Sequence, residues 1–149
     1  MGKNKDNAFF KVVELLSKYG FEPSSLRINS DLEFVTSSTT ELRNNLTNRK
    51  LGSDINFFTK KKKKYIIRQM HQDKSGSSWM KIDSLAKELL EWKSQLKQDS
   101  ALFFLTGEYL GSDEILDYCY KLEKELKTVG KIYITNEQLL KKLLQEGRL

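Results

Sequence analysis

The chain has 149 residues, enough for one ordinary domain with a hydrophobic core, and we expect a single domain over residues 1–149. Hydrophobic residues make up 38% and charged residues 31%, a balance that excludes an intrinsically disordered chain. The formal net charge of +6 makes a polyanion such as nucleic acid a candidate partner.

The sequence predicts no association with a membrane. No window approaches the roughly 18 consecutive apolar residues that a membrane-spanning helix needs. Residues 1–5 are polar, and no apolar signal block follows them. The single cysteine, Cys119, excludes an internal disulfide and a cysteine-based metal site, and we interpret it as a core residue on a helix. These features favour a cytoplasmic protein.

The first elements are a helix and a β-rich region. Apolar residues recur at helical spacing over residues 7–19, and Pro23 follows in a predicted turn. Residues 26–28 and 32–36 are apolar, β-branched or alternating, which predicts two strands. Residues 41–48 are polar, with only Leu42 and Leu46 to bury, so their structure is weakly determined.

A hairpin is predicted next, with strands over residues 54–58 and 65–72. The intervening residues are five consecutive lysines, Lys60, Lys61, Lys62, Lys63 and Lys64. Mutual repulsion forces their ammonium groups into solvent, so the run marks a protruding tip. Such a tip is either a solvated surface or a contact for phosphates.

The second half alternates helices and strands. Apolar residues form helical stripes in three segments, and two short apolar segments separate them. This order predicts an α/β sandwich whose later strands run parallel. The expected elements are a helix over 79–97, a strand over 101–106, a helix over 113–129, a strand over 131–135 and a final helix capped by Asn136.

The residues around the second hairpin strand form a further pattern. Asp54 begins the first strand, Ile66-Ile67 and Gln72 flank the second, and a Ser75-Gly76-Ser77 turn leads to a helix that carries Lys81. This pattern resembles the PD-(D/E)XK superfamily of restriction and repair nucleases. The similar subgroup has a strand reading roughly Ile-Ile-Glu-x-Lys-x-Gln, and the resemblance covers roughly residues 52–144.

The resemblance implies a restriction-endonuclease-like three-layer sandwich, in which a mixed central sheet is flanked by helices. It implies Mg²⁺ held by Asp54 against a scissile phosphate, because hard divalent cations bind carboxylate and phosphate oxygens. The candidate catalytic positions are Asp54, Arg68, His71 and Gln72. Ser77, Lys81 and the five lysines are candidate DNA contacts.

The sequence departs from the family pattern at the catalytic pair. Arg68 stands where the pattern has the acid, and Met70 stands where it has the lysine. A guanidinium group cannot ligate Mg²⁺, and a thioether offers no proton chemistry at neutral pH. A one-residue slip would present Gln69 and His71 instead, although a lone histidine at such a position is more often an ordinary, partly exposed strand residue than a catalyst. Glu33 or Asp73 are further possible ligands.

Three functions follow as hypotheses. The first is a DNA-acting protein, a type II restriction endonuclease or a subunit of one, that cleaves phosphodiester bonds with a divalent metal. The second is a catalytically inactive relative that binds DNA or a nuclease partner, with Arg68 and the lysines on phosphates. The third is a protein-interaction domain without nucleic acid. A homodimer or a companion nuclease subunit is expected from the resemblance alone.

Overall fold

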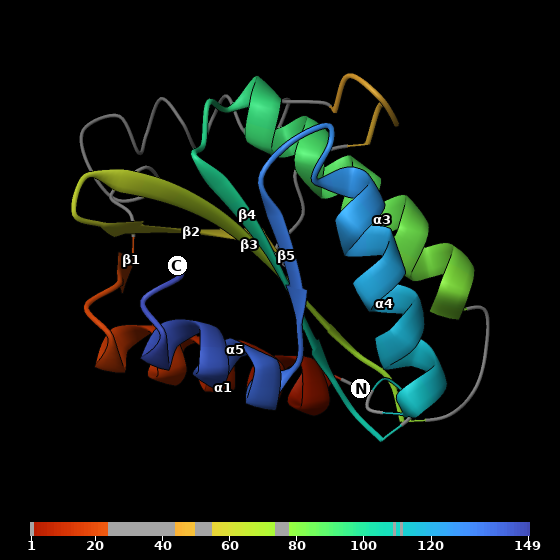
Figure 1. Ribbon diagram of the computed structural model, residues 1–149, viewed down its shortest axis with the longest axis horizontal. Coiled ribbons are helices and arrows are strands. Elements are labelled where there is room, and N and C mark those ends of the chain that lie inside the picture. The colour runs from red at the N-terminus through yellow and green to blue at the C-terminus, as the bar shows by residue number, and fades with distance from the viewer. Residues whose placement is uncertain (1, 24–43, 50–54, 74–77, 109, 111) are drawn as a thin grey trace.

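The structure is a computed structural model that describes residues 2–23, 44–49, 55–73, 78–108, 110 and 112–149. It has three layers, with a β-sheet between two pairs of helices (Figure 1). This arrangement confirms the predicted α/β class and the mixed central sheet flanked by helices.

The sheet has five strands in the order β1-β2-β3-β4-β5. The first three strands are antiparallel, whereas β3, β4 and β5 are parallel to one another, as the alternation of helices and strands predicted. The strands are β1 (Glu22–Pro23), β2 (Ile55–Lys60), β3 (Lys63–His71), β4 (Ser100–Thr106) and β5 (Ile132–Thr135).

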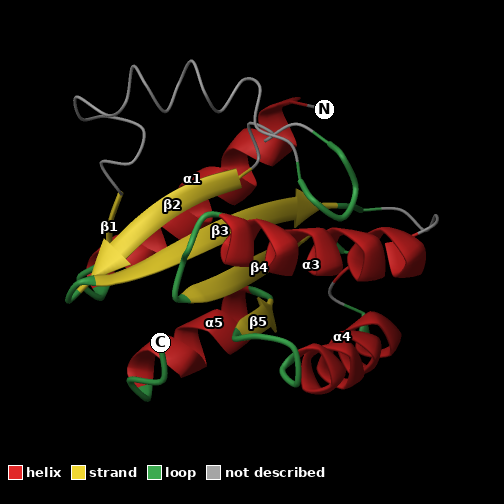
Figure 2. Ribbon diagram, turned by 90° about the horizontal axis from the view of Figure 1, so that it is seen from above, coloured by secondary structure: helices red, strands yellow, loops and turns green. Residues whose placement is uncertain are grey.

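Two helices cover each face of the sheet (Figure 2). α1 (Gly2–Lys18) and α5 (Glu137–Gln145) pack on one face, around Phe58, Ile67 and Phe104. α3 (Ser78–Gln95) and α4 (Asp113–Leu126) pack on the other face, which the fully buried Trp92 helps to fill. Among the described residues, no helix is long and apolar enough to span a membrane.

Several boundaries differ from the sequence predictions. Pro23 lies in the short strand β1 rather than in a turn, a position that proline tolerates because an outer strand edge needs no N–H donor. Leu46, expected to be buried, is 61% exposed, and Asn44 is buried in its place. The predicted strands over 26–28 and 32–36 lie outside the described residues.

Candidate functional site

Arg68 lies on the face of β3 that α3 and α4 cover. Its side chain is 3% exposed, and its Nη1 lies 3.1 Å from Oε1 of Glu88 on α3. Glu88 is itself only 2% exposed, so the two charges form a buried ion pair. The position that the resemblance assigns to a catalytic acid therefore holds a guanidinium group that pairs with a helix carboxylate.

The second oxygen of Glu88 binds the segment 44–49. Glu88 Oε2 accepts a hydrogen bond of 2.9 Å from the Thr47 hydroxyl and lies 3.4 Å from Nη1 of Arg49. Asn44 Nδ2 donates to the backbone oxygen of Glu88 at 3.0 Å. These contacts hold residues 44–49 against α3. Glu88 therefore joins β3, α3 and this segment, and its pair with Arg68 has a structural role.

The residues that β3 presents do not fit Mg²⁺. Arg68 carries a fixed positive charge and no lone pair for a metal, and the thioether of Met70 packs against the hydrophobic core. Asp54, Ser77 and Glu33, which were predicted as metal ligands or DNA contacts, lie outside the described residues. In the described ranges, no three His, Cys, Asp or Glu side chains group to hold a metal ion.

His71 lies on the opposite face of β3 and joins a polar cluster. Its Nε2 lies 2.9 Å from Oδ2 of Asp73, and its Nδ1 lies 2.8 Å from the hydroxyl of Thr106 on β4. The other oxygen of Asp73 accepts from the backbone N–H of Glu108 at 3.2 Å. Because a carboxylate only accepts, Nε2 of His71 donates to Asp73, and a neutral ring can accept the Thr106 proton at Nδ1.

This cluster lies at the carboxyl ends of the parallel strands β3 and β4. A cavity of about 500 Å³ opens there against α1. Its polar lining consists of His71, Asp73, Thr106, Glu108, Lys11 and Glu14. The carboxyl ends of parallel strands are a common place for ligand sites in α/β folds. The arrangement fixes the orientation of the imidazole ring, because both of its nitrogens are engaged by Asp73 and Thr106.

The pKa of Asp73 lies below its usual range, chiefly because of the hydrogen bond from His71 and also because of the N–H of Glu108. A depressed native pKa contributes stability above the pKa of the unfolded chain, and this contribution is lost as pH falls through the native pKa. We expect the Asp73 carboxyl in His71→Phe to titrate closer to its ordinary value, as measured by NMR. An unchanged titration would contradict the His71–Asp73 bond.

Gly107 allows the end of β4 to approach the exit of β3. Its φ is +106°, and a Cβ there would meet the backbone of Gln72, whose N–H donates to the Thr106 oxygen at 3.0 Å. We expect Gly107→Ala to lower the free energy of unfolding by about 2–3 kcal/mol, measured by urea denaturation. Gly20→Ala is the control, because Gly20 also has a positive φ but no neighbour within 4 Å. Equal losses in both variants would contradict the close approach.

The lysine hairpin, defined as Lys60 to Lys64, forms the tip of β2 and β3. Lys60 pairs with Lys63, so the strands extend further into the lysine run than predicted. Lys61 and Lys62 form the two-residue turn with φ of 49° and 71°, as in a type I′ turn. Lys61–Lys64 are exposed, which confirms the predicted tip, and Lys60 Nζ lies 4.8 Å from the centre of the Phe21 ring.

The predicted site residues fall at two ends of the sheet. β3 runs from Lys63 to His71, so about 26 Å of strand separates the lysine hairpin from the polar cluster. Figure 1 shows the hairpin turn at the left and the carboxyl ends of β3 and β4 at the lower right. Lys81, exposed near the start of α3, follows the carboxyl end of β3. One small ligand cannot contact both groups.

Cys119 is buried on α4, as predicted. Burial raises the pKa of its thiol to about 12, so at neutral pH it is a protonated core side chain rather than a nucleophile.

No protein-family model matches the chain, and no curated protein matches its sequence.

Proposed function

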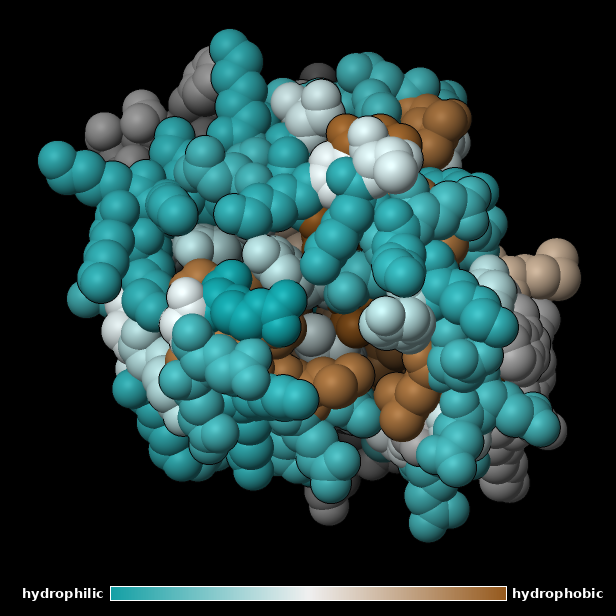
Figure 3. Space-filling view, in the orientation of Figure 1, coloured by the Kyte–Doolittle hydropathy of each residue, from teal (hydrophilic) through white to brown (hydrophobic). Residues whose placement is uncertain are grey.

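We propose that this chain binds DNA and that the lysine hairpin contacts the phosphate backbone. Four of the five lysines are exposed, and among the described residues no carboxylate pairs with any of their ammonium groups. Hydrophilic side chains project from this end of the molecule (Figure 3). Exposed, uncompensated positive charge is the feature that binds phosphates independently of base sequence.

The turn conformation is the observation that carries this proposal. Lys61 and Lys62 both have positive φ, a conformation that costs a non-glycine residue about 1–2 kcal/mol. Asparagine and glycine suit such a turn far better. Residues that break a local structural preference are expected where function requires them. Adjacent lysines in a strained, self-repelling turn are therefore best explained by a polyanionic partner.

We also propose that the domain is a restriction-endonuclease-like relative that lacks the Mg²⁺ site of that family. The antiparallel hairpin, the following helix α3 and the parallel strand β4 support this relationship. The buried Arg68–Glu88 pair supports the absence of metal-dependent cleavage at β3, and in this proposal the domain binds DNA alone, as a homodimer or beside a companion nuclease subunit. In this proposal Arg68 does not contact phosphate, because it is buried.

Binding to a short DNA duplex, followed by fluorescence anisotropy, tests the proposal. We expect binding at low salt that weakens steeply as salt rises, because bound lysines release counterions from the duplex. The duplex sequence should matter little, since phosphate contacts carry no base information. The absence of binding at low salt would reject DNA as the partner and favour the protein-interaction hypothesis.

A cleavage assay distinguishes a protein that binds DNA without cutting it from an active nuclease. We expect no nicking of supercoiled plasmid in Mg²⁺ or Mn²⁺ beyond the level of the Asp54→Ala variant, because Arg68 and Met70 do not form a metal site. Nicking that requires both the metal and Asp54 would establish the alternative, a metal-dependent endonuclease with an altered site.

A further inference from the structure

The loop between α3 and β4, residues 96–99, lies against the base of the lysine hairpin. Both backbone polar groups of Lys64 bind Asp99. The Lys64 N–H donates to Asp99 Oδ2 at 2.7 Å, and the Asp99 N–H donates to the Lys64 oxygen at 2.8 Å. Gln98 is buried, and its Nε2 donates to the backbone oxygen of Leu96 at 2.9 Å. These bonds fix the position of the loop relative to the hairpin.

Lys97 is exposed in this loop and has a left-handed backbone conformation. Its φ is +55° just after the end of α3, where glycine or asparagine is the usual residue. Lys61, Lys62 and Lys97 are three of the four non-glycine residues with positive φ in the described ranges. Lys97 is two residues from Asp99, so their Cα atoms are at most about 7 Å apart. Lys97 therefore continues the positive surface of the lysine hairpin onto the loop.

Asp99 brings one negative charge to this positive surface. The residue is exposed, and within the part of the chain that the structure describes no lysine or arginine forms an ion pair with its carboxylate. The Debye length is about 8 Å at physiological salt, so this carboxylate acts on anions held beside it by Lys64 or Lys97. It offsets one of the positive charges that such an anion meets.

We propose that Lys97 is a further phosphate contact of the DNA-binding surface and that Asp99 limits the affinity of this surface. The inference rests on the proposed DNA binding by the lysine hairpin. Asp99 holds the loop against Lys64 and cancels the charge that Lys97 adds. The hairpin and the loop together therefore bind DNA with the net charge of Lys61–Lys64.

Fluorescence anisotropy with a short DNA duplex tests this proposal in the variant Asp99→Asn. The amide oxygen of asparagine can still accept from the Lys64 N–H, so the loop stays in place while the negative charge is removed. We expect the affinity at 50 mM salt to rise about tenfold. The logarithmic salt slope should steepen from about −3.6 to about −4.5, because one more phosphate is neutralised.

The variant Lys97→Asn tests the other half of the proposal. Asparagine suits the left-handed conformation, so the fold should be at least as stable in urea as the wild type. DNA affinity at 50 mM salt should fall about tenfold, and the salt slope should decrease to about −2.7. The double variant Lys97→Asn/Asp99→Asn removes both charges, so its affinity and slope should return to the wild-type values.

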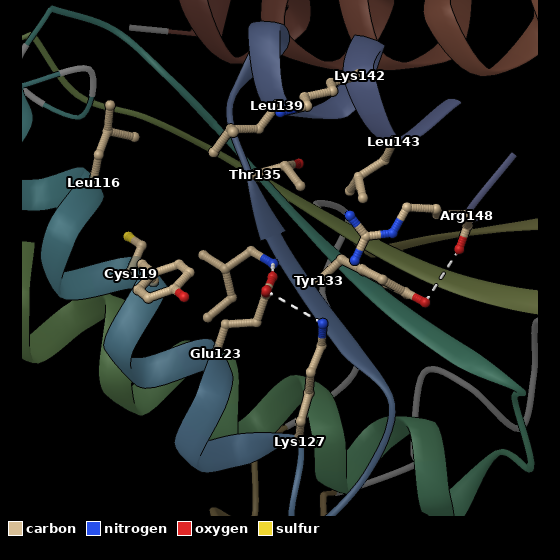
Figure 4. Close-up of a pocket in the computed structure, with 12 residues that line it drawn as sticks. Leu116, Cys119, Glu123, Lys127, Tyr133, Thr135, Leu139, Lys142, Leu143 and Arg148 are labelled. Atoms are coloured by element: carbon tan, nitrogen blue, oxygen red, sulfur yellow. Dashed lines mark hydrogen bonds and ion pairs between the residues drawn. The ribbon is translucent and has the colours of Figure 1, made fainter. Parts of the chain in front are cut away.

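The matched control is Glu123→Gln, because Glu123 also binds the backbone of a strand. Its Oε1 accepts from the Ile134 N–H at 2.6 Å, beside Lys127 in a cavity between α4, β5 and α5 (Figure 4). Ile134 is in register with Arg68, which lies four residues, or about 13 Å, along β3 from Lys64. The control makes the same change of net charge beyond the Debye length, so DNA affinity should stay near the wild-type value.

Equal effects of Asp99→Asn and Glu123→Gln would overturn the proposal, because net charge alone would then determine the affinity. A wild-type slope in Lys97→Asn would overturn it as well. In both cases salt-sensitive binding by the wild type would leave the proposed function standing. The absence of binding at low salt, in the wild type and in Asp99→Asn, would instead reject the proposed function together with this inference.

Discussion

Replacing Glu88 with leucine is expected to lower the free energy of unfolding by about 3–5 kcal/mol. The change removes the Glu88 carboxylate from a buried ion pair with Arg68, whose side chains are 4% and 2% exposed and whose charged atoms lie 3.1 Å apart. It also removes the acceptor of the Thr47 hydroxyl. Urea denaturation followed by circular dichroism measures the loss, and the m-value should stay constant.

The double variant Arg68→Met/Glu88→Gln is the control for this prediction. It removes both charges, and glutamine can still accept from Thr47, so we expect more than half of the lost stability to return. Asp83→Asn breaks the exposed Lys87–Asp83 pair of the same helix and should cost at most about 0.5 kcal/mol. A loss of less than about 1 kcal/mol in Glu88→Leu would contradict a buried pair.

Changing Lys61 to asparagine and Lys62 to glycine is expected to strengthen the fold and weaken DNA binding. Asparagine and glycine suit the type I′ turn, so the free energy of unfolding should rise by about 1–2 kcal/mol. The loss of two phosphate contacts should weaken binding about 100-fold at 50 mM salt. Because stability and affinity change in opposite directions, unfolding cannot explain weaker binding.

Urea denaturation and fluorescence anisotropy on the same preparations measure these two effects. The control Lys121→Gln/Lys141→Gln removes the same charge from exposed positions on α4 and α5. It should keep most of the affinity, because those lysines lie outside the hairpin. Equal weakening in both variants would show that net charge, and not the hairpin, determines binding.

The sequence predicts the hairpin and the later alternation well, because local signals determine both. Five adjacent lysines cannot be buried, and Asn136 caps the last helix as expected, with its side chain accepting from the Leu139 N–H. Pro23 was misassigned because a proline at a strand edge and a proline in a turn look alike in sequence. Whether such a proline lies in a strand or in a turn depends on which strand pairs with it, here β2.

The Arg68–Glu88 ion pair and the polar cluster around His71 both depend on contacts between residues that are far apart in the sequence. Glu88 lies between Leu85 and Leu89 of the apolar stripe of α3, a pattern that could have indicated a buried acid but from which none was predicted. Its pairing with Arg68 requires knowledge of how α3 crosses β3. His71 contacts Thr106 only because the parallel register of β3 and β4 places the two residues side by side. That register could not be predicted from a single sequence.

The salt dependence of DNA affinity in the wild type and in Lys61→Asn/Lys62→Gly tests the central claim most directly. If each of Lys61–Lys64 neutralises one phosphate, the logarithmic slope should be about −3.6, a loss of about 150-fold between 50 and 200 mM salt. The variant should give a slope of about −1.8 and a loss of about 12-fold. Equal slopes for the two proteins would contradict phosphate binding by the lysine hairpin.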